Sequence, residues 1–299
     1  MKRQTKGMAL AAFGGSLWGL AGIMVELLFK HKAFSPEWVV SNRLVYAGVL
    51  ILAYAKLIMG QKICRVFKQK KDASSLLAFA LIGMAGVQYL FFKAIESSGA
   101  ALAAILQFTA PIFIYLYQLL AREKALYWKE FLLILGAVFG VGLMVTNGSL
   151  NSLNFSSTGV FAGIGSAVAG AFYILQPRRI QAIYGSATVV GWGMLLAGIF
   201  FQGIAPIWSV KEILDLYSLI LLAGIIVFGT AFSFLSYLSS TAYISPSLAS
   251  VMTALEPILS VILTVLIFKK SFGLYEIIGM VLVLSMVIFL SQMESKGEN

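Results

Sequence analysis

A series of long apolar segments runs through this chain from one end to the other and constrains its fold more than any other feature. A helix needs roughly 20 apolar residues to cross the hydrocarbon core of a bilayer. Ten segments of about this length are separated only by short polar stretches. They are Met8–Phe29, Trp38–Ile58, Ser75–Ile95, Ala100–Leu120, Trp128–Thr146, Thr158–Gln176, Ala187–Ile207, Tyr217–Leu238, Ser247–Phe268 and Gly273–Leu290. We expect helices, because an open sheet edge in hydrocarbon leaves backbone groups unpaired.

The composition supports a membrane location. Hydrophobic residues make up 60% of the 299 positions and charged residues only 11%, whereas a soluble chain carries about 25% charged residues. The net charge of +10 would suggest nucleic acid in a soluble protein. Here the basic residues lie between the apolar segments, where they set membrane topology. We therefore expect a lipid bilayer and no nucleic acid among the partners.

The distribution of lysine and arginine predicts the orientation. With the amino terminus inside and ten spans, 15 basic residues fall on the inner side and 6 on the outer side, with Arg43 inside a span. This excess follows the positive-inside rule. Both termini are therefore predicted to be cytoplasmic, and the first apolar segment is read as a retained helix, since it is too long for a signal peptide.

The two halves of the chain show a weak internal repeat. Pro111 and Pro257 are 146 residues apart, each in the fourth segment of its half, and at the same offset Gln107 falls on Thr253. Five spans per half is an odd number, so the second copy must run in the opposite direction through the membrane. The predicted fold class is an all-α integral membrane protein of ten helices in two inverted five-helix repeats.

The repeat also predicts the domain boundaries. Residues 1–146 form the first repeat, residues 147–157 an extracytoplasmic linker, and residues 158–299 the second repeat with a short cytoplasmic tail. The linker is uncharged and rich in asparagine and serine.

Glu256 is the most informative residue of the sequence. It lies nine residues into a predicted span, near the bilayer midplane, where an ionisable group is costly and normally marks a functional cavity. Desolvation favours the neutral form of a carboxyl group, so Glu256 is a candidate for proton coupling as well as substrate binding. A protonated glutamate that only packs between helices is the alternative.

Both fourth segments carry a proline that interrupts the helix. Pro257 is expected to free the carbonyl group of Thr253, and Pro111 that of Gln107, because a helical proline has no N–H for the residue four positions back. Tyr115 lies on the same helical face as Gln107. Kinks at corresponding places in two repeats indicate a binding site at the repeat interface. The alternative is a pair of packing kinks, which membrane helices tolerate.

The first two segments contribute another set of candidate residues. Trp18 offers a stacking surface for a cation or a ring. Glu26 lies near the outer end of the first segment, and Arg43 lies at a similar depth in the second. We predict an ion pair between Glu26 and Arg43 that closes or shapes the outer mouth, with Glu26 as a second candidate for ion coupling. A static bridge between adjacent helices is an equal alternative.

The remaining polar residues are less specific. Gln88 and Tyr173 are predicted to add polar groups to the cavity. One cysteine, Cys64, excludes an internal disulfide, and one histidine, His31, excludes a multi-histidine metal site. With no nucleotide-binding glycine loop and no cluster of metal ligands, we expect no catalytic residues, no metal and no cofactor.

Several short motifs resemble the drug/metabolite transporter superfamily of the EamA type. They include Gly15-Ser16-Leu17-Trp18-Gly19, Leu106-Gln107-Phe108-Thr109-Ala110-Pro111 followed by Glu123, and Ala254-Leu255-Glu256-Pro257. The pattern is most similar to the carboxylate/amino acid/amine branch. The resemblance implies ten helices in inverted repeats, a central cavity, alternating access and export of small metabolites. Lys269 stands where the repeat would place a second copy of Glu123, which argues against a symmetric role for that acid.

The sequence therefore predicts a secondary active transporter, an exporter by resemblance, for a small metabolite such as an amino acid or amine in the bacterial cytoplasmic membrane. A membrane-embedded lipid-modifying enzyme and a non-transporting sensor are the alternatives. A homodimer is one oligomeric state that we consider.

Overall fold

The computed structural model describes residues 2–32, 34–122, 127–147, 156–210, 214–240, 243–244 and 252–297. These residues form helices and their connections, with no strand among them. Glu123, most of the predicted linker (148–155) and the predicted start of the ninth span at Ser247 lie outside the described ranges.

The first half contains nine helical elements. In chain order they are α1 (Lys2–Lys32), α2 (Pro36–Leu57), η1 (Ile63–Lys68), α3 (Lys70–Ala78), η2 (Phe79–Met84), α4 (Ala85–Ser98), α5 (Ala100–Gln107), α6 (Ala110–Leu120) and α7 (Trp128–Thr146).

The described part of the second half has a similar order, with the short helix α9 in addition. Its elements are α8 (Ser157–Leu175), α9 (Arg178–Tyr184), α10 (Ser186–Gln202), η3 (Ile207–Ser209), α11 (Leu216–Ile226), η4 (Val227–Phe232), α12 (Ser233–Ser240), α14 (Leu255–Phe268) and α15 (Leu274–Gly297).

The third apolar helix of each half is interrupted by one π-helical segment. In the first half η2 lies between α3 and α4, and in the second half η4 lies between α11 and α12. A π-helical segment adds a residue to the turn, breaks the regular hydrogen-bond ladder and is frequent at functional sites. The two halves therefore share an irregularity that hydropathy alone does not reveal.

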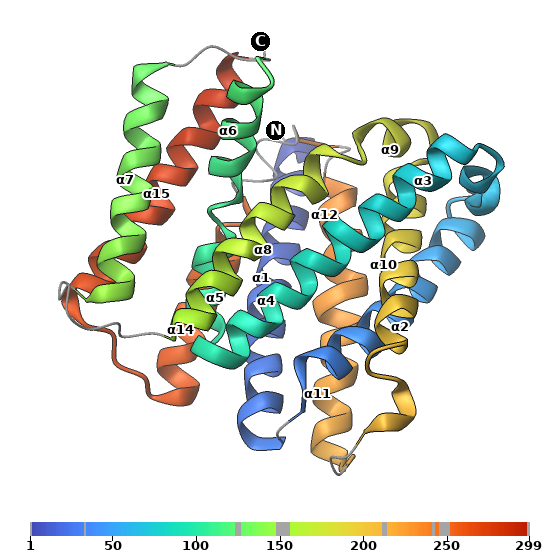
Figure 1. Ribbon diagram of the computed structural model, residues 1–299, viewed down its shortest axis with the longest axis horizontal. Helices are drawn as coiled ribbons and strands as arrows, with labels where there is room; N and C mark the ends of the chain where they lie inside the picture. Colours follow the sequence, from blue (N-terminus) through green and yellow to red (C-terminus); the bar gives the residue numbers. More distant parts are fainter. Residues whose placement is uncertain are drawn as a thin grey trace.

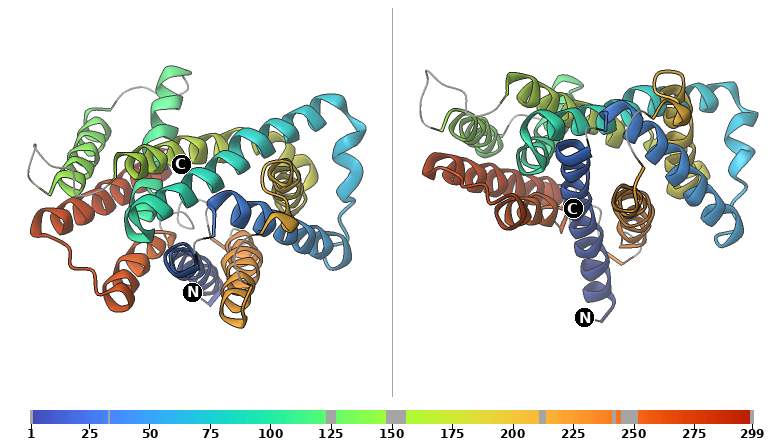
Figure 2. Two further views of the ribbon diagram at one scale, coloured as in Figure 1. Left: turned by 60° about the horizontal axis from the view of Figure 1, so that its bottom comes forward. Right: turned by 90° about the horizontal axis from the view of Figure 1, so that it is seen from below.

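The helices pack in pairs that join the two halves. α2 packs along α10, α7 along α15, and α4 along α8, while α1 lies against both α12 and α14. In Figure 1 α1 is central, and α7 and α15 form a separate flank at the left. Figure 2 shows the same flank from two further directions. The α7–α15 crossing is close because glycines face each other: a Cβ on Gly279 would lie 2.5 Å from the Gly140 carbonyl oxygen.

Both chain ends lie at one end of the bundle, which we call the terminal end (the top of Figure 1). The connection between α1 and α2 and the start of α11 lie at the other end, which we call the opposite end.

Each of the ten predicted apolar segments contains a helix. Within the described ranges, six helices are long and apolar enough to cross a membrane, or seven if α9 and α10, bent by 118°, form one span. Three further apolar helical stretches are shorter: Phe131–Thr146, Leu255–Phe268 and Leu274–Phe289. The prediction of an all-helical membrane protein is confirmed.

Candidate functional site

Glu256 lies in the first turn of α14. The chain turns at Thr253 and Ala254 before α14 begins, and the Glu256 N–H donates to the Thr253 carbonyl oxygen at 2.9 Å. Pro257 has no N–H to donate to the Thr253 carbonyl oxygen, and the Glu256 N–H donates to it instead. The prediction of a free Thr253 carbonyl group is therefore wrong. Because the helix begins here, its positive end lies beside the carboxylate and favours a negative charge. The Glu256 residue is half-buried, so part of it stays accessible.

Helix α1 holds this turn in place through close backbone contact. A Cβ atom on Gly19 would lie 2.7 Å from the Glu256 carbonyl oxygen, and one on Gly15 would lie 3.2 Å from Thr253 Cα. Small residues allow such close approach between membrane helices. Gly15 and Gly19, one turn apart on α1, therefore fix Glu256 relative to α1.

Arg43 approaches the site from α2. Its Nε donates to Thr230 Oγ1 at 2.6 Å, and its guanidinium lies 4.9 Å from the ring centroid of Phe92. The guanidinium also interacts electrostatically with Glu256. Arg43 is 6% exposed, so these contacts replace water around a buried cation.

Thr230 is a site residue that the sequence analysis missed. It lies in η4, where its hydroxyl donates to the Ile225 carbonyl oxygen at 2.9 Å while accepting from Arg43. A bond to the carbonyl five residues back suits the π-helical turn. Nothing in the apolar pattern around Thr230 indicates this turn.

Aromatic side chains surround the same region. The Trp18 ring lies 5.1 Å from Phe234 and 5.5 Å from Tyr237, both on α12. The Tyr173 ring on α8 lies 5.2 Å from that of Phe79. Helices α1 and α12 thus bring Trp18 and Tyr237 together, and Tyr173 packs on the first half through Phe79.

Glu26 has a different environment. Its Oε1 pairs with Lys30 Nζ at 2.7 Å, and its Oε2 accepts from the Ala100 N–H, the first of α5, at 2.7 Å. Glu26 therefore caps the amino end of α5, whose first N–H groups have no partner within the helix. Since Glu26 pairs with Lys30 and Arg43 bonds to Thr230, the predicted Glu26–Arg43 pair is wrong.

The other predicted residues are spread more widely. Gln88 on α4 is 8% exposed, and its Nε2 lies 3.9 Å from Met84 Sδ. Gln107 ends α5, and Pro111 lies in the first turn of α6, so the fourth helix of the first half is broken where predicted. Tyr115 is fully buried in the core of α5, α6, α7 and α15, where its hydroxyl accepts from the Tyr127 N–H at 3.4 Å. The structure does not bring Tyr115 to Glu256.

No group of three histidine, cysteine, aspartate or glutamate residues within the described ranges is arranged to hold a metal ion. The residues described above are an acid, a base and aromatic rings, groups that can bind a small charged or amphipathic molecule.

A match to a family model identifies the class of protein. The model of the EamA-like transporter family matches residues 5–146 and again residues 157–292. The chain belongs to the EamA-like transporter family. The resemblance carried by the glycine, proline and glutamate motifs is thereby confirmed, and the family is one of transporters rather than enzymes.

Relatives of this EamA-like transporter agree with the assignment. It is 35% identical over 290 residues to the uncharacterized inner membrane transporter YicL of Salmonella typhimurium strain LT2, covering 96% of this chain and 95% of YicL. It is 28% identical over 137 residues to the threonine/homoserine exporter RhtA of Escherichia coli K12, covering 46% of this chain and 44% of RhtA. A crystal structure matches with a TM-score of 0.65 and 17% identity, covering 100% of this chain and 99% of the other; it supports the fold.

Proposed function

We propose that this EamA-like transporter is a secondary active exporter of a small amino acid or amine across the bacterial inner membrane. The observation that carries the proposal is the position of Glu256, which lies in the first turn of α14, is half-buried as a residue and interacts electrostatically with buried Arg43. Broken helices with a charged group at the midplane are where transporters built from repeats bind substrate and coupling ion.

Ten helices cross the membrane in this proposal, as two inverted repeats over residues 1–146 and 158–299. The helix packing supports two halves that are related by a two-fold axis. α1, the first helix of one half, packs on α12 and α14, while α8, the first helix of the other, packs on α4 and α5. α2 pairs with α10 and α7 with α15, each with its counterpart. The two family matches cover the same halves.

The orientation follows from charge. The terminal end carries η1 and α9 with their lysines and arginines, so it is the cytoplasmic end by the positive-inside rule. Glu256 then lies between a cytoplasmic entrance and an extracytoplasmic exit.

The site offers both charges of an amino acid a partner. The Glu256 carboxylate suits an ammonium group, and the Arg43 guanidinium, held by Thr230, suits a carboxylate. Trp18 and Tyr237 supply aromatic faces for an ammonium or an apolar side chain. In the absence of substrate, a proton on Glu256 serves as the coupling ion, because desolvation favours the protonated form of a carboxyl group. The similarity to the exporter RhtA supports an amino acid as substrate and export as direction.

A counterflow assay in proteoliposomes tests the proposal. Proteoliposomes that contain the purified protein are loaded with one unlabelled amino acid or amine at a time, and uptake of the labelled compound is measured. We expect exchange of at least one small amino acid or amine by the native protein, and a strong reduction of this exchange at the same substrate concentration in Glu256→Gln. Glu96→Gln is the matched control, because Glu96 pairs with Lys93 within one helix. A native protein that exchanges none of the panel, or Glu256→Gln at the native rate, contradicts the proposal.

A further inference from the structure

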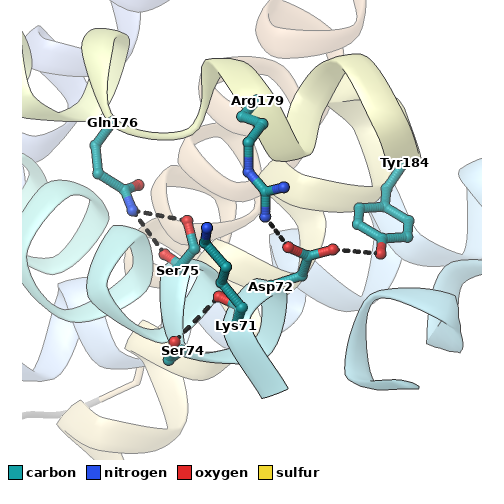
Figure 3. Close-up of polar contacts among 7 residues, drawn as sticks. All are labelled: Lys71, Asp72, Ser74, Ser75, Gln176, Arg179 and Tyr184. Atoms are coloured by element: carbon teal, nitrogen blue, oxygen red, sulfur yellow. Dashed lines mark hydrogen bonds and ion pairs between the residues drawn. The ribbon is translucent and has the colours of Figure 1, made fainter. Parts of the chain in front are cut away.

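Two ion pairs join the halves of the molecule, one at each end of the bundle. At the terminal end Asp72 of α3 pairs with Arg179 of α9, as Figure 3 shows. At the opposite end Asp215, which precedes α11, pairs with Lys32 at the end of α1. Each pair connects one half of the chain to the other.

The two aspartates occupy corresponding positions in the halves. Asp72 and Asp215 are 143 residues apart, and each is followed three residues later by a serine and then a leucine, Ser75-Leu76 and Ser218-Leu219. Each begins the third apolar helix of its half, the one that contains a π-helical segment.

The cations correspond in the same way. Lys32 is the last residue of the first helix of its half, and Arg179 follows α8, the first helix of the other half. They are 147 residues apart, close to the 146 that separates Pro111 from Pro257. Each pair therefore joins the start of the third helix in one half to the end of the first helix, or to the short helix α9 that follows it, in the other.

The terminal-end pair is part of a network. The Asp72 side chain is 1% exposed and also accepts from the Tyr184 hydroxyl at 2.6 Å. Gln176, at the end of α8, donates to both the carbonyl and the hydroxyl oxygen of Ser75 at 2.9 Å (Figure 3). The start of α3 is thus bound to α8 and α9 through two neighbouring contacts.

The opposite-end pair is simpler and more exposed. Asp215 caps α11, accepting from the Ser218 N–H at 2.9 Å and its hydroxyl at 2.7 Å, and pairs with Lys32. The side chains of Lys32 and Asp215 are 27% and 38% exposed. The ammonium of Lys32 holds the pKa of Asp215 well below its usual range.

We propose that Asp72–Arg179 and Lys32–Asp215 are equivalent ion pairs that open one at a time, each closing its own end of the transport path. Alternating access in a repeat protein comes from movement of one half against the other. An ion pair between the halves at one end therefore opposes opening there and favours opening at the other. The π-helical segments η2 and η4 lie in the helices that each pair holds and supply the points at which these helices bend. The inference rests on the proposed function.

Distance measurements between spin labels test the inference without substrate. In a Cys64→Ser background, cysteines replace Ser74 and Ala182 to span the terminal end, or His31 and Leu216 to span the opposite end; all four are exposed. Pulsed electron–electron double resonance in lipid nanodiscs then gives the distance distribution at each end.

We expect Asp72→Asn to raise the long-distance population at the terminal end by roughly two- to fivefold, the range for an ion pair with one exposed partner, and to lower it at the opposite end. Asp215→Asn is expected to do the reverse. Arg179→Gln and Lys32→Gln remove the cation of each pair and repeat each test if a neutral aspartate variant does not fold. Glu96→Gln is the control and leaves both distributions unchanged.

Unchanged distributions in both variant pairs overturn the inference, as does opening of both ends by either variant. Opposite shifts in a protein that exchanges no amino acid or amine would support these ion pairs while contradicting the proposed function.

Discussion

Glu26 and Glu256 are both glutamates inside the helical bundle, and their surroundings differ in a way that separates a structural role from a transport role. Glu26 is 2% exposed, and both of its oxygens have partners, Lys30 and the first N–H of α5. Glu256 lies in the first turn of α14, is half-buried as a residue and interacts electrostatically with Arg43. A carboxylate whose two oxygens are both engaged by the fold holds helices together, whereas in our proposal Glu256 is the carboxylate that binds a solute.

The largest expected effect is that of removing the Glu256 charge. A hydrogen bond to a charged group contributes about 2 kcal/mol, which corresponds to roughly 30-fold in binding. We therefore expect Glu256→Gln to weaken substrate binding by about that factor, measured as the shift in half-saturation of counterflow. In Glu26→Gln the half-saturation value stays native; equal shifts in both variants would remove the distinction between the two glutamates.

A smaller effect is expected when Arg43 is changed. In Arg43→Gln the substrate carboxylate loses its cation but the ammonium keeps Glu256, so an amino acid should lose about tenfold in affinity and the corresponding amine much less. Competition by matched amino acid and amine pairs measures this difference. Equal losses for both compounds would mean that Arg43 acts only through the fold.

Glu26 is expected to matter for stability. Glu26→Ala leaves the amino end of α5 without its cap, which costs about 1 kcal/mol of unfolding free energy, with a further cost for the buried N–H. Thermal unfolding in detergent measures the loss, and Glu96→Ala is the matched surface control. A native unfolding temperature in Glu26→Ala would show that the cap contributes nothing.

The smallest expected effect concerns pH at the opposite end. Lys32 lowers the pKa of Asp215 in the folded protein. A lowered folded-state pKa means that the stabilisation is complete above the unfolded value of about 4 and is lost as pH falls through the lower folded value. Asp215 therefore stays ionised between about pH 5 and pH 8, and its titration should not change the distance between labels at positions 31 and 216 in this range. A transition in this range that disappears in Asp215→Asn would contradict the assignment.

The sequence predicts the helices better than their contacts. Hydropathy locates all ten apolar segments, and the cost of a buried charge singles out Glu256, because both depend on local composition. The partners depend on how distant segments pack: Arg43 and Thr230 are 187 positions apart, and Glu26 and Ala100 are 74 apart. For this reason the Glu26–Arg43 prediction is wrong, and Thr230 and Asp72 were missed. Tyr115 shares a helical face with Gln107, but the break before α6 separates their surroundings.

The pH dependence of transport in Glu256→Gln tests the central claim most directly. Native protein, Glu256→Gln and Glu26→Gln are reconstituted in parallel, and substrate flux is measured with and without a pH gradient. The account predicts that a gradient drives flux in the native protein and in Glu26→Gln, and that Glu256→Gln loses this response. A Glu256→Gln protein that keeps both its native flux and its response to the gradient would contradict the account.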